Sequence, residues 1–333
     1  MLIHLCAAAV TAAAAAAVPG AASAATDAGC PAPTVTAATP ARLATALADA
    51  RPGDVIEIAD GTYNGDWTAT APGTPTAPIW LCGGPGAVLT NDGYDGAYGL
   101  HLDGASWWHP YGFTVAQAKK GVVVDSAEHV TLERLHIHDV GDEGVHLRRN
   151  TTNSLITGNR VHDTGLAHDA WGEGVYIGSA NVNWPVYTGG LPDRSDGNTV
   201  AGNMIYATTA EPVDVKEGTT GGLVSGNSLD AGALTEDGGD SCGDVKGNDW
   251  VISGNTCTGS PADGWQTHRK QGSGDWGLRA DFTANTVDLA GRPGDGGLGF
   301  KIDDPARSLA TVRCDNAVTG GAFANVPCTA PNS

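Results

Sequence analysis

A short phrase recurs along the middle of the chain, and this repetition constrains the fold more than any other feature of the sequence. Each copy has apolar residues on both sides of an asparagine: SLITGNRVHD (154–163), NTVAGNMIYA (198–207), GLVSGNSLDA (222–231), WVISGNTCTG (250–259) and DFTANTVDLA (281–290). The asparagines recur at intervals of 24 to 44 residues: Asn159, Asn203, Asn227, Asn255 and Asn285. Such a period is typical of a solenoid, in which each repeat packs only against its neighbours.

Each repeat reads as two or three short strands with period-two alternation, broken by Gly, Asn and Asp turns. The chain contains 48 glycines, and helical periodicity is scarce after residue 50. We therefore predict an all-β fold, a right-handed parallel β-helix. An inward asparagine at the same turn of each coil would form a hydrogen-bonded ladder along the axis.

The two ends of the chain differ from the repeats. The stretch ARLATALADA (41–50) has an apolar helical stripe, which predicts a short N-terminal capping helix over the first coil. Residues 1–24 are alanine-rich and end in Ala22-Ser23-Ala24, which predicts a signal peptide; a retained membrane helix is disfavoured because the apolar run is short. Residues 25–333 form one predicted domain, with a cap at about 40–52, coils at about 53–305 and a tail at 306–333.

Cysteine content and charge indicate the compartment and limit the partners. Six cysteines follow the predicted signal, which suggests disulfides in a secreted, extracellular protein. Six cysteines allow fifteen connectivities, among which we prefer Cys30–Cys82, Cys242–Cys257 and Cys314–Cys328. The net charge of −19 disfavours nucleic-acid binding, which needs a basic surface. An anionic substrate would need a local basic cluster or bound cations. We expect a monomer that acts on an acidic polysaccharide, with no nucleic-acid partner and no membrane.

One strand recurs at an equivalent place in four coils: EGVHLRR (143–149), EGVYIGS (173–179), EPVDVKE (211–217) and SCGDVKG (241–247). Because side chains alternate between the faces of a strand, one set points into the coil. The inward set is Val145, Leu147, Val175, Ile177, Val213, Val215 and Val245. The outward residues form a basic row, Arg148, Gly178, Lys216 and Lys246, and a mixed row, His146, Tyr176, Asp214 and Asp244.

Glutamates begin three of these strands and form an acidic row, Glu143, Glu173 and Glu211. Neighbouring strands lie about 4.8 Å apart, so like charges repel unless something compensates them. We expect Gly178 to open a gap in the basic row for a ligand, and Lys301 to extend that row. A solvated, mutually neutralising face is the alternative, and spacing alone leaves both open. The pair His136-x-His138 is interpreted as two outward side chains of a strand rather than as a metal site.

The combination of a basic row, a mixed row and an acidic row suits β-elimination on a uronic-acid polysaccharide. In this reaction a base removes a proton from the carbon next to a carboxylate. That proton is only weakly acidic until the charge of the carboxylate is neutralised. A Ca²⁺ ion held by acidic oxygens can neutralise it. Lys216 is the predicted base, with Ca²⁺ near Glu211 and Asp214, because neighbouring cations and desolvation lower a lysine pKa. Lys246 or Arg148 would assist at the departing oxygen.

The segment NMIYATTAEPVDVKEGTTGGLVSGNSL (203–229) resembles the central motif of the chondroitinase B and alginate lyase family of β-helix lyases. In that motif a Glu is followed five positions later by a Lys, and Glu211 and Lys216 match both. The segment PGDVIEIADGTYNG (52–65) resembles the family's opening. The resemblance implies that Glu211 is a calcium ligand and Lys216 the Brønsted base.

Two positions depart from the family pattern. Its second acidic ligand falls on Thr209, so Asp214 or Glu173 would have to replace it, and its catalytic arginine falls near Lys246. We therefore predict that the oxygens of Glu173 and Glu211 converge within about 5 Å. The predicted metal ligands are Glu173, Glu211 and Asp214.

Other residues are predicted to bind substrate through flat or cationic side chains. These are His146, Tyr176, Trp184, Trp265, His268 and Arg269. Two other functions remain open. Asp214 and Asp244 on adjacent coils are compatible with a glycoside hydrolase that uses a carboxylate pair. A non-catalytic glycan-binding solenoid would use the same face without turnover.

Overall fold

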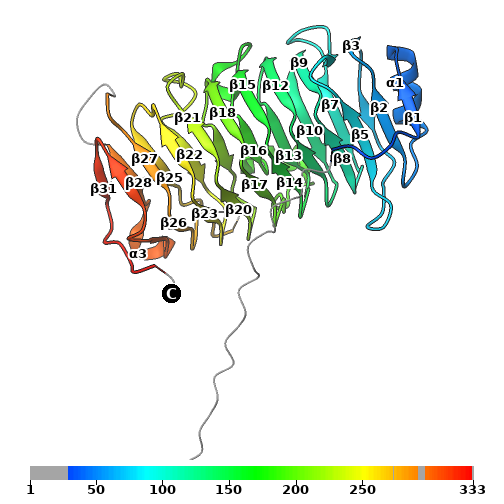
Figure 1. Ribbon diagram of the computed structural model, residues 1–333. Coiled ribbons are helices and arrows are strands. Elements are labelled where there is room, and N and C mark those ends of the chain that lie inside the picture. The colour runs from blue at the N-terminus through cyan, green and yellow to red at the C-terminus, as the bar shows by residue number, and fades with distance from the viewer. Residues whose placement is uncertain (1–28, 273, 292–296, 332–333) are drawn as a thin grey trace, which may run out of the picture.

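The chain winds around one axis and adds a strand to each of three parallel sheets as it advances (Figure 1). The computed structural model describes residues 29–272, 274–291 and 297–331, and the predicted signal peptide lies outside these residues. Every pairing between successive coils within the three sheets is parallel. The architecture is therefore a parallel β-helix, as the repeat predicts.

Each copy of the recurring phrase forms a strand of sheet A, a turn with the asparagine, and a strand of sheet B. Sheet A contains, in spatial order, β1 (Val35–Ala37), β2 (Val55–Ile58), β5 (Ile79–Gly83), β8 (Trp108–Tyr111), β11 (Thr131–Glu133), β14 (Leu155–Thr157), β17 (Thr199–Ala201), β20 (Leu223–Ser225), β23 (Val251–Ser253), β26 (Asp281–Thr283) and β29 (Thr311–Val312). Sheet B contains β3 (Gly61–Asn64), β6 (Ala87–Thr90), β9 (Thr114–Ala118), β12 (His136–Val140), β15 (Arg160–Thr164), β18 (Met204–Thr208), β21 (Ser228–Asp230), β24 (Thr256–Thr258), β27 (Thr286–Asp288) and β30 (Ala317–Thr319).

Sheet C carries the strands that the sequence places side by side. It contains β4 (Thr68–Ala69), β7 (Tyr98–Asp103), β10 (Lys120–Asp125), β13 (Val145–Arg148), β16 (Val175–Ile177), β19 (Val213–Val215), β22 (Ser241–Val245), β25 (Asp263–Thr267), β28 (Leu298–Lys301) and β31 (Ala322–Ala324). The register pairs His146 with Tyr176, Tyr176 with Asp214, and Asp214 with Asp244. The mixed row predicted from the sequence is therefore confirmed.

The basic row continues just beyond these strands. The backbone N–H groups of Gly178, Lys216 and Lys246 each donate to a carbonyl of the preceding coil, at 2.7, 2.9 and 2.8 Å. This keeps the three residues in line with Arg148 and confirms the predicted row. Lys301, in contrast, pairs with Gln266, which pairs with Asp244. Lys301 therefore lies in the mixed row, and its expected place in the basic row is wrong.

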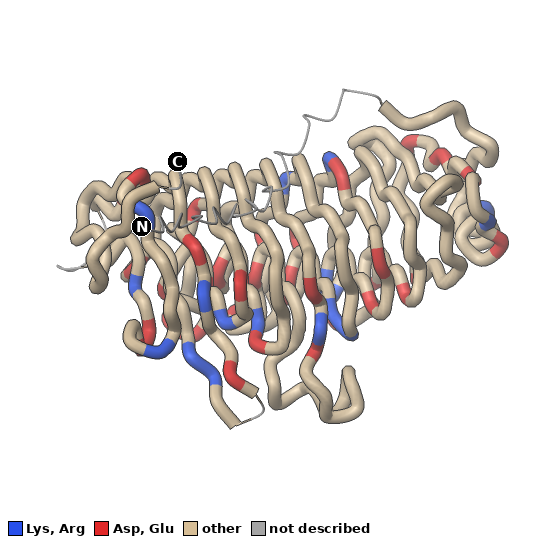
Figure 2. Tube along the Cα trace, turned by 90° about the horizontal axis from the view of Figure 1, so that it is seen from below, with Lys and Arg blue, Asp and Glu red and all other residues tan. Residues whose placement is uncertain are grey.

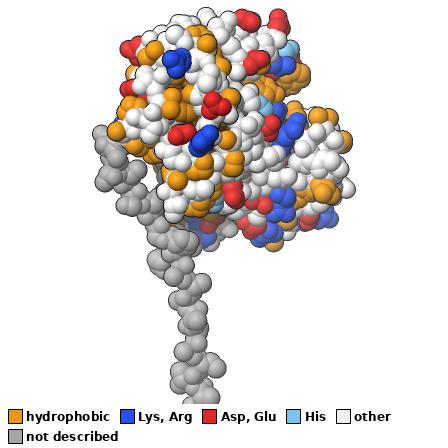
Figure 3. Space-filling model, turned by 90° about the vertical axis from the view of Figure 1, so that its right-hand side faces the viewer, with side chains coloured by type: hydrophobic (Ala, Val, Ile, Leu, Met, Phe, Trp, Pro, Cys, Tyr) orange, Lys and Arg blue, Asp and Glu red, His pale blue; other side chains and the backbone are white. Residues whose placement is uncertain are grey.

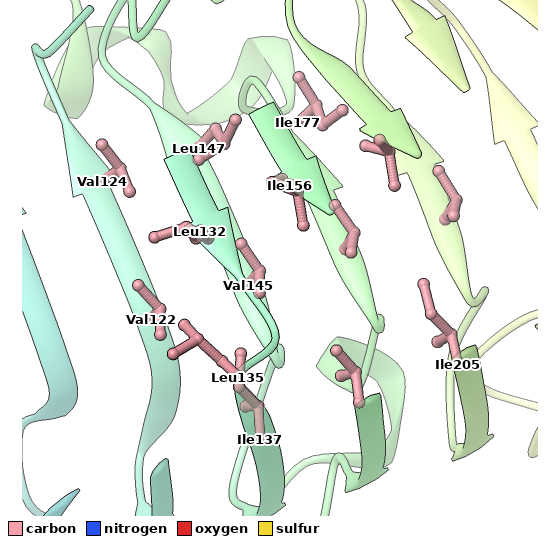
Figure 4. Close-up of a cluster of buried hydrophobic side chains, with 14 of the residues drawn as sticks. Val122, Val124, Leu132, Leu135, Ile137, Val145, Leu147, Ile156, Ile177 and Ile205 are labelled. Atoms are coloured by element: carbon pink, nitrogen blue, oxygen red, sulfur yellow. The ribbon is translucent and has the colours of Figure 1, made fainter. Parts of the chain in front are cut away.

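Aliphatic side chains from all three sheets fill the interior (Figure 4). The seven residues predicted to point inward are all fully buried. Burying an aliphatic side chain of this size contributes about 1.5–3 kcal/mol relative to leaving it exposed. The alternation that aims these residues inward also aims their neighbours outward, so core packing fixes which side chains face solvent on sheet C.

The predicted asparagine ladder is present. Asn159, Asn203, Asn227 and Asn255 each donate from Nδ2 to Oδ1 of the next rung, at 2.8–3.0 Å. Each Nδ2 also donates to a backbone carbonyl of the preceding coil. Asn285 continues the ladder to Asn316, a rung that the sequence prediction omitted. The ladder satisfies buried polar groups at every turn and so holds the coils in register.

The N-terminal end is covered by α1 (Pro40–Ala48), which confirms the predicted capping helix. Thr39 caps the helix by accepting from the N–H of Arg42, and Leu43 and Leu47 are buried against the first coil. The other helical segments are short: η1 (Asp169–Trp171), η2 (Asn181–Asn183), α2 (Trp184–Tyr187) and α3 (Pro305–Ser308). None of the helices in the described residues is long and apolar enough to span a membrane.

All three predicted disulfides form: Cys30–Cys82, Cys242–Cys257 and Cys314–Cys328. The first ties the N-terminal segment to β5, and the last ties down the chain that follows β29. Disulfides persist in oxidising compartments, so this pattern fits an extracellular protein.

Candidate active site

A cavity of about 530 Å³ opens over sheet C, between the strand row and the loops that follow β15 and β16. Outward side chains of β10, β13 and β16 form its floor, and Trp171 of η1 and Val182 of η2 belong to its walls.

Acidic and basic positions lie next to each other on successive coils in the middle of the molecule (Figure 2). Acidic and basic side chains are also interspersed over the N-terminal end (Figure 3). The net negative charge therefore does not give this end of the molecule a surface of a single sign.

Asp214 occupies the centre of the charged rows. Its carboxylate lies 2.5 Å from Nζ of Lys216 and 3.0 Å from Nζ of Lys246. Lys246 also lies 2.8 Å from Asp244, whose other oxygen is 3.1 Å from Nε2 of His268. The carboxylates and amines therefore form one continuous network rather than separate surface pairs.

The two lysines of this network are held as cations. Burial alone would lower the pKa of Lys216, but the carboxylates of Asp214 and Glu173 outweigh it and raise the pKa. The pKa of Lys246 is likewise raised, because Asp214 and Asp244 outweigh the effect of burial. Any process that removes negative charge from this network would lower both pKa values.

Three carboxylates converge beside these lysines. Glu173, Glu211 and Asp214 each offer an oxygen, and the three oxygens lie within 4.8 Å of one another. The predicted convergence of Glu173 and Glu211 is therefore confirmed. Glu173 comes from the segment before β16, and the other two come from β19 and the residues just before it. The parallel register brings Glu173 and Glu211 together because they precede equivalent strands, β16 and β19, of successive coils, and Asp214 follows Glu211 on β19.

The convergence leaves negative charge uncompensated. Burial, then the neighbouring carboxylates of Glu143 and Asp214, raises the pKa of Glu173 well above its usual range. Burial, followed by Asp244 and Asp214, raises the pKa of Glu211 to about 8. Among the described residues, buried Oε2 of Glu173 has no hydrogen-bond partner. An orphaned carboxylate oxygen within a set of three buried carboxylates fits a hard divalent cation, which prefers oxygen ligands.

A second charged group also lines the cavity and is well compensated. Lys120 contacts both Glu143 and Asp142, and Nδ1 of His146 lies 3.3 Å from Glu143. Burial opposes ionisation of Glu143, but His146 and Lys120 outweigh it and hold the pKa of this carboxyl well below its usual range. Nε2 of His146 lies 2.9 Å from the carbonyl oxygen of Gly178, which fixes the imidazole at the cavity floor.

Tyr176 lies between these two groups. Its side chain lines the cavity, packs edge-on against His146 and has Nζ of Lys216 4.7 Å from its ring centroid. Burial, then the carboxylates of Glu173 and Asp214, raises the pKa of Tyr176 well above its usual range. The phenol therefore stays protonated and can act as a proton donor beside the Lys216 amine.

Arg148 contributes a fixed positive charge to the same cavity. Its guanidinium lies 2.6 and 3.1 Å from the two oxygens of Asp125 and also donates to the hydroxyls of Tyr98 and Tyr187. Burial opposes its charge, but the hydrogen bonds to Asp125 outweigh it, and the pKa of Arg148 is raised. The side chain is 3% exposed, so it presents charge to the cavity from an immobile position.

Comparison with known proteins supports this architecture. Residues 98–269 match the family described as the right handed beta helix region, which is more than half of the chain. The alginate lyase from Paenibacillus sp. str. FPU-7 is 33% identical, and the match covers 87% of this chain and 97% of that one with a TM-score of 0.79. The chain belongs to the right-handed β-helix family.

More distant relatives share this β-helix with other functions. Pectate lyase Pel9A is 15% identical over 89% of this chain and 79% of its own, with a TM-score of 0.64. PfbA, a surface adhesin of Streptococcus pneumoniae, is 13% identical over 86% of this chain and 74% of its own, with a TM-score of 0.60. These two similarities establish the fold alone. No curated protein matches the sequence.

Several predicted substrate contacts lie elsewhere in the β-helix. Trp265 is fully buried in the core, because the register pairs it with Gly243 and so aims its ring inward. Trp184 is 2% exposed, and its indole N–H donates to the carbonyl of Ser179 within the loop. Neither ring offers a face to a sugar, and both predictions are wrong for that reason.

The remaining departures concern residues near the C-terminal side of the cavity. His268 and Arg269 are not among the described residues that line it; His268 faces Asp244, and Arg269 contacts Asp275. Lys246 is also absent from the lining and is turned toward Asp214 and Asp244. Gly178 opens no gap, since a Cβ there would lie 2.6 Å from a methyl of Thr219.

The sequence predictions missed part of the cavity. Lys120 and Asp142 were not predicted, because the overlay of strands began at residue 143. The segment KKGVVVD (119–125), one coil earlier, has the same Gly-Val pair followed by alternating residues. Extending the overlay would have found Lys120. Trp171 is 53% exposed and belongs to the loop after β15. No pattern marks it, because loop conformation is independent of the repeat.

Proposed function

We propose that this protein is a secreted polysaccharide lyase that cleaves a uronic-acid-containing polysaccharide by β-elimination. The observation that carries the proposal is an amine and a protonated phenol in one cavity, with a cluster of converging carboxylates that reaches the cavity through one of its members. Lys216 and Tyr176 line the cavity, while Glu173 joins its lining to the carboxylate cluster. Alginate is the first substrate to test, because the 33% identical relative is an alginate lyase.

The reaction requires one base and one acid. Lys216 would become neutral once the negative charge of the carboxylates beside it is compensated, and it would then take the proton from the ring carbon that bears the uronate carboxylate. The electron pair left on that carbon would form a carbon–carbon double bond as the adjacent glycosidic carbon–oxygen bond breaks. The departing oxygen would take the proton of the Tyr176 phenol. The products are a shortened chain and an unsaturated uronate, and atoms and electrons balance without an oxidant or reductant.

Tyr176 replaces Lys246 in the role at the departing oxygen. Lys246 is committed to two carboxylates, whereas Tyr176 lies on the cavity floor next to Lys216. Arg148 stays in the proposal as a cationic wall that attracts and orients an anionic sugar. His146 is fixed at the floor between Glu143 and the Gly178 carbonyl, where it would contact substrate. Trp171 supplies an exposed ring on which a sugar can stack.

Calcium fits the carboxylate cluster. Glu173, Glu211 and Asp214 would hold it, and the orphaned oxygen of Glu173 is the group that most needs such a partner. When bound, a divalent cation supplies charge that neutralises a uronate carboxylate and makes the neighbouring proton more acidic. The chain's own contribution is to keep three carboxylates converged and Lys216 beside them.

The hydrolase alternative fits less well. A carboxylate pair needs one member that stays protonated and gives up its proton to the leaving group. Lys246 bridges Asp214 and Asp244, and burial of Asp244 is outweighed by Lys246 and His268, which hold its pKa well below the usual range. Neither residue lines the cavity among the described residues.

The products of the reaction test the proposal. Purified protein is incubated with alginate, pectate and chondroitin, each with calcium or with a chelator, and ultraviolet absorbance of the unsaturated uronate is followed. Absorbance that grows with alginate and stops with chelator supports the lyase and its metal. New reducing ends without that absorbance would support the hydrolase. Retention of the polymer without any product would support a binding solenoid.

A further inference from the structure

Three histidines gather on the outside of sheet B, away from the cavity on sheet C. His136 and His138 lie on β12, and His162 lies on β15 of the next coil, directly opposite His138 in register. The ring centroids are 4.3 Å apart for His136 and His138, 4.9 Å for His136 and His162, and 5.2 Å for His138 and His162. The proposed lyase reaction uses none of them.

The closest contact in this group joins two ring nitrogens. Nε2 of His136 lies 2.7 Å from Nε2 of His162. Two imidazole nitrogens at this distance share either one proton or one cation. Metal–nitrogen bonds of about 2.0–2.1 Å would place both nitrogens on one ion at an angle of about 80°. This is close to the right angle between neighbouring ligands in tetragonal sites, which copper(II) and nickel(II) favour.

Carboxylates orient two of the rings. Nδ1 of His162 lies 2.6 Å from Asp163, and Nδ1 of His138 lies 2.7 Å from Asp139. A carboxylate beside Nδ1 accepts a hydrogen bond from the N–H of the neutral ring, so the lone pair lies on Nε2. Metal-binding histidines are held in the same way. At His162 the lone pair is the one that faces His136.

The charges around the group suit a divalent cation. Arg160 lies opposite His136 and is the nearby cation, and its guanidinium hydrogen-bonds to the hydroxyl of Tyr206. Asp139 and Asp163 add two negative charges.

We propose that His136 and His162 form a binding site for a divalent transition metal that prefers imidazole, nickel(II) or copper(II), with His138 beside them. The site goes beyond the proposed lyase function and is independent of it. A metal there joins β12 to β15 and so fastens two adjacent coils. His138 and His162 are 22% and 12% exposed, so an ion can reach the site from solvent.

The test uses untagged protein, since a histidine tag would bind the same metals. Nickel(II) is titrated calorimetrically in excess calcium, which occupies the carboxylate cluster. We expect a single site per chain, weakened at least about tenfold in His136→Gln and in His162→Gln. Asp163→Asn removes the carboxylate that orients His162 and should weaken binding by about tenfold. His109→Gln is the matched control, because His109 also pairs with a carboxylate but lies on sheet A.

Two readouts keep the test decisive. Copper(II) bound in the wild type should show nitrogen hyperfine lines in its electron paramagnetic resonance spectrum, and these lines should be lost in the double variant His136→Gln/His162→Gln. Nickel(II) should raise the unfolding temperature of the wild type and of His109→Gln, but not of the double variant. Binding of equal strength in all variants, or no binding by the wild type, would overturn the proposal.

Discussion

The asparagine ladder and the charged rows of sheet C are built by the same repeat, yet they differ in how completely their polar groups are satisfied. Each internal rung of the ladder donates to the next rung and to a backbone carbonyl. In the charged rows, Glu173 keeps an oxygen without a partner among the described residues, and the pKa of Glu211 is raised by burial to about 8. A fully satisfied ladder stabilises the fold, whereas an unsatisfied one leaves polar groups available to a ligand.

The charged rows themselves divide into two parts. Toward the N-terminus, Arg148 pairs with Asp125, and Glu143 is matched by Lys120 and His146. Further along, three carboxylates converge on two lysines that are already shared. Charge imbalance in one part of otherwise balanced rows is typical of a functional site.

The largest expected effect is a loss of enzymatic activity. Lys216→Ala should lower turnover on the cleaved polymer by about a thousandfold, because the base is lost, and Tyr176→Phe by about a hundredfold. Initial rates from product absorbance measure both. Lys301→Ala is the matched control, since Lys301 pairs with Asp263 outside the cavity. Retention of full activity by Lys216→Ala would remove this lysine from the mechanism.

The ladder should show the opposite pattern, a loss of stability. In Asn227→Ala, the backbone N–H of Asn203 and one of the two N–H bonds of its Nδ2 lose their acceptor. Each buried group left unpaired costs about 1–3 kcal/mol, so we expect the free energy of unfolding to fall by about 3 kcal/mol or more. Denaturant unfolding measures the change. Asn64→Ala, at an exposed asparagine, should stay within about 0.5 kcal/mol of the wild type.

The balanced part of the charged rows should lose stability in acid. Burial opposes ionisation of Asp125, but its hydrogen bonds to His101 and Arg148 outweigh burial and hold its pKa well below the usual range. A carboxyl with a lowered folded-state pKa stabilises the fold above its unfolded value of about 4 and loses that contribution as pH falls below it.

Asp125→Asn should therefore be less stable than the wild type at neutral pH, by about 1–3 kcal/mol. The difference should narrow when denaturant unfolding is repeated in acid below about pH 4. A constant difference across this range would mean that Asp125 contributes by packing and not by charge.

The smallest expected effect is a difference in stability between variants of two glutamates of the acidic row. Glu173→Gln removes a charge that burial and neighbouring carboxylates disfavour, so without calcium the unfolding free energy should stay unchanged or rise by about 1 kcal/mol. The same change should abolish stabilisation by added calcium. Glu143→Gln is the matched comparison and should destabilise, because Lys120 and His146 lose their partner. Equal effects of the two variants would contradict the difference in charge balance.

Much of the site followed from the repeat, because a parallel strand transmits its register from coil to coil. The overlay of EGVYIGS and EPVDVKE was enough to bring Glu173 and Glu211 together. The overlay failed where side-chain environment, rather than register, decides the outcome. Trp265 is a different case, because its strand was left out of the overlay, and the register alone pairs it with Gly243 and turns it into the core. Lys246 shares the row of Lys216 but turns to Asp214 and Asp244 instead of the cavity.

By itself the sequence determined the coil, its inward residues, the ladder, the capping helix and the three disulfides, because each depends on local alternation or on a spacing that repeats. Tertiary structure alone decided the cavity walls, the position of Tyr176 between two charged groups and the contact between His136 and His162. These depend on loop paths and on side-chain rotamers chosen by neighbours from different coils. Such choices minimise the energy of the whole assembly and leave no periodic trace in the chain.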